Sequence, residues 1–355
     1  MSTHYDVVVI GTGAGGGTLA YALAGTGKWI LLLDRGPRLP REKENWDTRA
    51  VILDGRYNPG EKWRSGDGEE FAPGVKYAVG GNTKVYGAAL LRLRPADFGE
   101  IHHEGGISPA WPLGYKEFEP WYAAAEQLYR VRGLHGVDPS AGPSSSPYPH
   151  PPIRHEARTR QLVADFARQG LRPWPLPLGL LLDDEHPEKE PCIRCDTCDG
   201  FPCLVKGKAD AQVICVEPAL RHPNVTLLTG AYVERLETDA TGRSVRTVHA
   251  NIGGERMRFD ADIVVSACGA VNSTALLLRS ASDLHPQGLG NSSGLLGRHY
   301  MAHQNSAVLY VSPGVLDGDV PRHHHRGARG DLTSAPICGE LPAGFPPRGR
   351  AGGIG

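Results

Sequence analysis

The alternation of apolar and polar segments predicts a strand–turn–helix–strand unit at the start of the chain. Residues 5–10, YDVVVI, form a continuous apolar and β-branched run, which is typical of a strand buried on both faces. The glycine-rich segment GTGAGG follows directly, and GTLAYALAG then places apolar side chains on one helical face. Residues 29–33, WILLL, form a second apolar run that ends at Asp34. The pattern therefore predicts a βαβ unit with a glycine turn after its first strand.

The glycines of this unit have the spacing of a phosphate-binding turn. Gly11 permits the tight turn from strand to helix, Gly13 lets the backbone approach a pyrophosphate, and Gly16 lets the helix lie close to the sheet. The amino terminus of the helix directs free N–H groups toward the phosphates. Asp34, 23 positions after Gly11, is suited to accept hydrogen bonds from ribose hydroxyls. We predict a dinucleotide site here, and the residues alone leave FAD and NAD open.

A second group of strands is predicted in the later part of the chain. The strands of an antiparallel meander, and the buried strand that follows them, are expected at residues 225–239, 244–252, 256–260 and 261–270. The last strand ends in small residues, Gly269 and Ala270 among them, which would let the chain pass close beneath a dinucleotide. A helix should follow, capped by Asn272 or Ser273. On the pattern alone, an ordinary hairpin beside a core strand is the alternative.

A glycine pair lies between these two groups, in YAVGGNTKVYGAALLRLRPADF at 77–98. Gly80 and Gly81, followed by the polar residues Asn82 and Thr83, are suited to form a second anion-binding concavity of backbone N–H groups. A plain turn is the alternative that these residues leave open.

Taken together and in this order, the segments resemble the glucose–methanol–choline (GMC) family of FAD-dependent oxidoreductases. The resemblance is carried by GTGAGGGTLAYALAG with Asp34, VGGNTKVYGAALLRLRPADF, NVTLLTGAYVERL, ADIVVSACGAVNSTALLLRS and GLGNSSGLLGRHYMAH at 288–303. It implies FAD, with the pyrophosphate at the glycine turn, the ribose at Asp34, the flavin beside residues 80–83 and the adenine at the backbone of Val233. Asp34 stands where many relatives carry Glu. An NAD-dependent enzyme is disfavoured, because the meander and the Gly-Ala strand suit FAD better.

The resemblance also implies a reaction. A base removes the hydroxyl proton of an alcohol or polyol, and the carbon-bound hydride passes to the flavin and then to an acceptor such as oxygen, a quinone or a cytochrome. In the family the catalytic histidine and its partner lie near the carboxyl terminus, and nothing after residue 303 matches that segment. Neither His299 nor His303 is expected to be the base, so the catalytic residues stay unknown. A truncated, catalytically inactive flavin-binding fragment is therefore the alternative function.

The predicted fold class is α/β, with a discontinuous FAD-binding, Rossmann-like domain and an interleaved, incomplete α+β substrate domain. The expected boundaries are 1–101 and 191–300 for the FAD-binding domain, 102–190 and 301–320 for the partial substrate domain, and 321–355 for a tail. The tail holds 5 Arg, 8 Gly and 5 Pro in 35 residues, and we expect it to be disordered. In a disordered tail no rigid element presents His323, His324 and His325, so we expect them to be solvated and to serve neither as metal ligands nor as catalytic bases.

Four of the seven cysteines are crowded into CIRCDTCDGFPC, at Cys192, Cys195, Cys198 and Cys203. Short C-x2-C loops are typical of iron–sulfur ligation, because they let several thiolates converge on one cluster. Zinc prefers two such knuckles separated by a longer loop. In some members of the resembled family, a Cys-rich loop holds an iron–sulfur cluster that passes flavin electrons outward. An iron–sulfur cluster, structural thiols or a disulfide, and zinc are all left open here.

Charge and composition restrict the partners. Lys and Arg total 38 against 39 Asp and Glu, a balance that predicts no nucleic-acid partner. The first residues, MSTHYDVVVIGTG, show no basic leader, and their apolar run is too short to cross a bilayer. We therefore expect no transmembrane segment and a cytoplasmic location, where thiols stay reduced.

Overall fold

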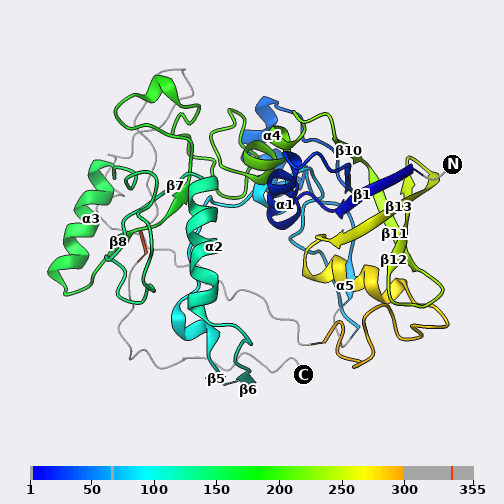
Figure 1. The fold of residues 1–355 in the computed structure, drawn as a ribbon. Helices are drawn as coiled ribbons and strands as arrows, with labels where there is room; N and C mark the ends of the chain where they lie inside the picture. Colours follow the sequence, from blue (N-terminus) through cyan, green and yellow to red (C-terminus); the bar gives the residue numbers. More distant parts are fainter. Residues whose placement is uncertain (1–2, 65–67, 105, 299–336, 339–355) are drawn as a thin grey trace.

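The computed structural model describes residues 3–64, 68–104, 106–298 and 337–338. Its largest sheet has six strands and lies on the right of Figure 1. The strand order across the sheet is β10-β2-β1-β13-β12-β11. Four neighbours, β10, β2, β1 and β13, run parallel, whereas β13, β12 and β11 form an antiparallel meander. The six strands are β1 (Thr3–Ile10), β2 (Ile30–Asp34), β10 (Val225–Thr229), β11 (Ala231–Thr238), β12 (Val245–Ile252) and β13 (Glu255–Ser266). The predicted α/β, Rossmann-like fold is confirmed.

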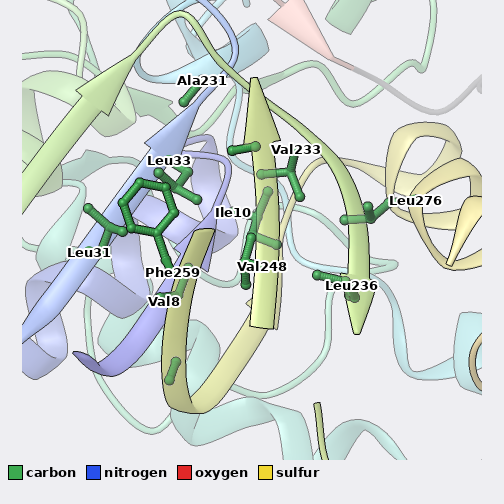
Figure 2. Close-up of a cluster of buried hydrophobic side chains, with 12 residues drawn as sticks. Val8, Ile10, Leu31, Leu33, Ala231, Val233, Leu236, Val248, Phe259 and Leu276 are labelled. Atoms are coloured by element: carbon green, nitrogen blue, oxygen red, sulfur yellow. The ribbon is translucent and has the colours of Figure 1, made fainter. Parts of the chain in front are cut away.

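The continuous apolar runs of β1 and β2 are explained by burial on both faces of the sheet. Val8 and Leu31 point into one core, which Phe259, Val248 and Leu276 complete (Figure 2). The alternate residues of the same strands enter a second core on the opposite face, where Ala20 and Ala24 of α1 (Ala14–Ala24) pack with Val216 and Ala219. Because successive side chains of a strand point to opposite faces, two buried faces require an unbroken apolar run.

The prediction of one continuous strand at 225–239 is wrong, because the chain forms two strands there, β10 and β11. Gly230, with φ of 64°, turns the chain in the left-handed region between the two strands. The first part joins β2 in parallel and the second joins β12 in antiparallel pairing. Conversely, the two strands predicted at 256–260 and 261–270 are one strand, β13, whose early residues pair with β12 and whose later residues pair with β1.

The helix after β13 begins earlier than predicted. It is α5 (Ala270–Arg279), and Gly269, with φ of 81°, precedes its first residue. The proposed caps, Asn272 and Ser273, therefore lie inside the first turn of α5. Ser273 instead accepts a hydrogen bond at its hydroxyl from the backbone N–H of Cys268, at 3.2 Å.

The segment between residues 102 and 190 contributes two longer helices, α2 (Tyr115–Leu128) and α3 (Ala157–Arg168), which lie apart from the central sheet in Figure 1. Arg92 attaches α2 to the preceding chain, because its buried guanidinium donates to Glu126 at 2.6 Å and to Glu119 at 3.0 Å. No helix in the described part of the chain is both long and apolar enough to cross a membrane. The predicted substrate-domain segment 301–320 lies outside the described residues.

The other elements are short. The strands are β3 (Trp63–Arg64), β4 (Glu70–Phe71), β5 (Ile101–His103), β6 (Gly106–Ser108), β7 (Val131–Arg132), β8 (Trp174–Pro175), β9 (Leu178–Gly179) and β14 (Ile337–Cys338). The single-turn helices are η1 (Lys43–Trp46), η2 (Arg49–Leu53), η3 (Gly81–Lys84), η4 (Pro95–Phe98), η5 (Pro187–Lys189), η6 (Gln212–Val216) and α4 (Glu217–Ala219). Apart from β14, the predicted tail 321–355 lies outside the described residues, and so do His299 and His303.

Candidate functional site

A cavity of about 720 Å³ opens at the carboxyl ends of β1, β2 and β13. Ligands of open α/β sheets bind at this edge, outside the carboxyl ends of the parallel strands. The cavity brings together most of the residues singled out in the sequence. Those that line it are Gly11, Gly13, Asp34, Gly81, Asn82, Thr83, Val233, Gly269 and Ala270. Gly16 and Gly80 are not among its lining residues.

The glycine turn approaches its neighbours so closely that side chains are excluded. Gly11 has φ of 94°, and a Cβ there would lie 2.5 Å from the carbonyl oxygen of Ala267. A Cβ on Gly16 would lie 2.0 Å from the carbonyl oxygen of Gly11. Gly13, by contrast, faces open space, with no atom nearer to such a Cβ than 4.0 Å. No side chain caps the first N–H groups of α1, so these donors face the cavity without an internal acceptor.

Asp34, at the end of β2, is buried, with 5% of its surface exposed. Its carboxylate accepts hydrogen bonds from the backbone N–H of Thr12 at 3.0 Å, from the Thr12 hydroxyl, and from the N–H of Gly36 at 2.8 Å. Burial raises the pKa of Asp34, and these hydrogen bonds oppose the rise. Thr12 gave no signal in the sequence, because its contact with Asp34 spans 22 positions of the chain.

The segment Gly80–Thr83 was expected from the resemblance to lie beside a flavin, and we refer to it by that expectation as the flavin-side loop. It rests directly on the glycine turn. A Cβ on Gly81 would lie 3.0 Å from the Cα of Gly13. The backbone N–H of Gly80 donates to the hydroxyl of Thr12 at 3.1 Å. Thr83 donates its hydroxyl hydrogen to the carbonyl of Gly80 and accepts from the N–H of Ala211 at 2.9 Å. The polar side chains of this loop therefore fix its backbone.

Stacked aromatic and guanidinium groups line a further part of the cavity. The guanidinium of Arg35 lies 4.0 Å from the ring centre of Tyr77 and 4.8 Å from that of Tyr232. Arg279 approaches Tyr232 as well, at 5.4 Å. Arg35 also forms an ion pair with Glu61 at 2.5 Å. The position of Arg35 next to Asp34 was the signal that could have identified it in the sequence.

No histidine lines the cavity among the residues that the structure describes. The polar groups that do line it include Lys76, Tyr77 and Asn272. Burial lowers the pKa of Lys76, and the Asn272 amide lies 3.5 Å from the Tyr77 hydroxyl. The Tyr77 hydroxyl also donates to Glu61 at 3.3 Å, and the Glu61 carboxylate is already paired with Arg35.

The four crowded cysteines form a folded loop, residues 192–203, that carries free thiols. Within the described ranges, which include this loop, no group of three or more His, Cys, Asp or Glu side chains is arranged to hold a metal ion. Cys192 and Cys198 pack against a small apolar core, and burial raises the pKa of Cys192 to about 11. A further cysteine, Cys268, follows β13 and lines the cavity.

Comparisons with known proteins find relatives for most of this chain. The profile described as "GMC oxidoreductase" matches residues 5–304. A 6'''-hydroxyparomomycin C oxidase from Streptomyces lividus is 34% identical over 330 residues, covering 88% of this chain and 57% of the relative. A paromamine 6'-oxidase from Streptomyces fradiae is 34% identical over 299 residues, covering 83% of this chain and 53% of the relative. The chain therefore spans a little over half the length of these curated relatives.

Solved structures show the same fold. A pyridoxine 4-oxidase from Mesorbium loti superposes with a TM-score of 0.51 at 20% identity, over 78% of this chain and 52% of that one. A formate oxidase from Aspergillus oryzae gives a TM-score of 0.52 at 17% identity, over 79% of this chain and 48% of the formate oxidase chain. At these identities the likeness concerns the fold.

Proposed function

The chain belongs to the GMC oxidoreductase family, and we propose that it binds FAD in the cavity described above and serves the oxidation of an alcohol or polyol. The observation that carries this proposal is the open face at Gly13, where uncapped N–H groups of α1 lie opposite the flavin-side loop. A volume of about 720 Å³ is within the range of cofactor cavities. Because the relatives are longer than this chain, the activity is proposed for the whole protein.

The residues of the cavity fit the parts of FAD. We assign the pyrophosphate to the turn Gly11–Gly13 and to the first amides of α1, since that end of a helix stabilises negative charge. The ribose is assigned to Asp34, whose oxygens accept hydrogen bonds. The adenine is assigned to the backbone of Val233, and the flavin to the flavin-side loop and to the small residues Gly269 and Ala270.

The chain's own contribution to the reaction is to bind and orient. FAD, when bound, supplies the acceptor for the hydride of the alcohol carbon. Thr12 fixes the carboxylate of Asp34 and the N–H of Gly80 at the same time, so the ribose and flavin parts of the cavity keep a constant separation. The proton of the substrate hydroxyl needs a base, and we assign none among the described residues.

Flavin binding without turnover is the second candidate function. It is favoured by one observation, the absence of a histidine from the described lining of the cavity. The two candidates share every cofactor contact and differ in whether an alcohol is oxidised.

The electron acceptor and the cysteines need a separate proposal. We assign Cys192, Cys195, Cys198 and Cys203 as structural thiols rather than as an iron–sulfur relay, because the described geometry does not bring three of them to one metal position. Oxygen, a quinone or a cytochrome is then the acceptor to be tested. The free thiols also support a reducing, cytoplasmic location.

Absorption and activity measurements test the proposal. The purified chain should show the two visible bands of oxidised flavin, and the flavin should be released as FAD on denaturation. Fructose and paromamine are the first substrates to test with an artificial electron acceptor, since relatives are named for fructose dehydrogenase and paromamine 6'-oxidase activities. Bleaching of the flavin by a substrate supports oxidation, flavin without bleaching supports the second candidate, and a chain that binds NAD but not FAD contradicts both.

A further inference from the structure

Lys208 is a lysine with almost no exposure to water, which is rare because burial of an ammonium ion is costly. Its side chain is 1% exposed, and its Nζ donates to the carbonyl oxygens of Cys198 at 2.5 Å, Phe201 at 2.9 Å and Lys84 at 3.4 Å. An ammonium ion has three donors and no acceptor, so three carbonyls match it completely. Two of them belong to the cysteine loop 192–203, which wraps its backbone around this cation.

No carboxylate lies within hydrogen-bond distance of Lys208 Nζ among the contacts of the described residues, and its partners there are the three carbonyls. Asp210, the nearest buried carboxylate along the chain, is already paired with another lysine, since Lys84 Nζ lies 2.9 Å from its Oδ2. Burial lowers the pKa of Lys208, while the thiols of Cys198 and Cys203 and the Asp210 carboxylate act in the opposite direction. The ring of Tyr86 adds a cation–π contact at 5.7 Å.

The third carbonyl links this arrangement to the cofactor cavity. Lys84 is the last residue of η3 (Gly81–Lys84), the turn that contains most of the flavin-side loop. A second link lies one residue away, where Thr83 accepts from the N–H of Ala211 at 2.9 Å. A Cβ on Gly80 would lie 3.1 Å from the backbone nitrogen of Gln212. The flavin-side loop is therefore also in contact with the chain that follows Lys208.

We propose that Lys208 is a positioning residue, whose ammonium ion joins the carbonyls of the cysteine loop to Lys84 and thereby fixes the flavin-side loop for the cofactor. The inference rests on the proposed FAD site and deepens it. It also gives the crowded segment CIRCDTCDGFPC a role that involves no metal, because its backbone oxygens hold an internal cation.

The substitution Lys208→Met tests this role, because methionine retains the apolar stem and removes all three donors. Lys206→Met is the matched control, since Lys206 is part-exposed and pairs with Glu217 at 2.7 Å. We expect Lys208→Met to bind FAD about tenfold more weakly. ADP, which carries adenosine and pyrophosphate without the flavin, should bind within about twofold of the wild type. Amide hydrogen exchange over residues 79–86 should become faster in the Lys208 variant and stay unchanged in the control.

Two outcomes would overturn the inference. One is unchanged FAD affinity together with unchanged exchange over residues 79–86. The other is an equal loss of FAD and ADP binding with faster exchange throughout the sheet, which is the behaviour of a general destabilisation. If Lys208→Met does not fold, Lys208→Gln, which keeps two donors, is measured in the same way. The exchange measurement needs no cofactor, so a wild type that fails to bind FAD contradicts the proposed function and leaves this test intact.

Discussion

The carboxylate of Asp34 accepts two hydrogen bonds from Thr12, one from the backbone N–H at 3.0 Å and one from the hydroxyl. The same hydroxyl accepts a hydrogen bond from the N–H of Gly80. One threonine therefore connects the end of β2, the glycine turn and the flavin-side loop. This connection orders three segments of the cavity before any ligand binds.

Thr12→Val should break this connection. The valine retains the shape and removes the hydroxyl, which leaves the N–H of Gly80 unpaired in a buried position. We expect a loss of about 1–3 kcal/mol in the free energy of unfolding and a weaker affinity for FAD. Thr12→Ser is the control, because it keeps the hydroxyl. Denaturant unfolding of both variants checks the prediction, and equal stability of the two variants would refute it.

The pH dependence of stability should report on Asp34. Its pKa in the folded chain is raised above the ordinary value of 3.8, with burial as the largest cause. The folded state therefore holds the proton more tightly than the unfolded state. The contribution of Asp34 protonation to the stability of the folded chain is complete below about pH 3.8. It is lost as the pH rises through the pKa of Asp34 in the folded chain. The unfolding free energy of wild type minus that of Asp34→Asn should fall over this range, and a difference that rises with pH would contradict the assignment.

Neighbouring glycines of α1 should respond to alanine in opposite ways. In Gly16→Ala the new Cβ would lie 2.0 Å from the carbonyl oxygen of Gly11, so the helix must move away from the sheet. We expect a loss of about 3 kcal/mol or more in the free energy of unfolding. Gly15→Ala is the matched control, since no atom lies within 4 Å of its Cβ and alanine favours the helix by up to about 1 kcal/mol. Thermal unfolding without cofactor should separate them, and similar losses in both would be evidence against the close packing.

The guanidinium of Arg35 should affect the adenosine half of FAD and not the flavin half. It stacks on Tyr232, which precedes the proposed adenine contact at Val233. We expect Arg35→Met to weaken FAD binding about tenfold and to leave FMN binding within about twofold, since FMN lacks adenosine. Arg235→Met, a change at an exposed arginine paired with Glu237, is the control. Fluorescence titration with both flavins measures the effect, and equal losses for FAD and FMN would place Arg35 elsewhere in the site.

The thiol of Cys192 should react slowly. Burial raises its pKa to about 11, so at about pH 7.5 it holds roughly 300-fold less thiolate than an ordinary cysteine. Alkylation by iodoacetamide, followed by peptide mass, should accelerate about tenfold per pH unit from about pH 7 to pH 10. The control is the same residue in the chain unfolded by urea. Equal rates in the folded and unfolded chain would show that Cys192 is not in the described environment.

The sequence predicts the strand–turn–helix–strand unit well because its signals are local. The run before Gly11 and the run before Asp34 are unbroken and apolar, and both strands are buried on two faces. The break at Gly230 was missed, because strand-forming residues stand on both sides of it and the change of partner strand depends on the sheet as a whole. This limit is general for elements whose partners are distant along the chain.

The parts of the site that the sequence did not reveal depend on contacts between distant residues. Arg35 and Tyr232 are separated by almost 200 positions, and no spacing rule connects them. Lys208 stands in the segment GKADAQV, whose composition gives no sign of complete burial. The cysteine spacing left an iron–sulfur cluster, structural thiols or a disulfide, and zinc open, and it gave no sign that the carbonyls of Cys198 and Phe201 would surround the Lys208 side chain.

Calorimetric titration of the cofactor-free chain with FAD and, separately, with NAD tests the central claim most directly. The structure predicts one FAD per chain, affinity for FAD at least about tenfold greater than for NAD, and loss of FAD binding in Gly16→Ala. Absence of heat with FAD from a folded chain, or tighter binding of NAD, would contradict the account.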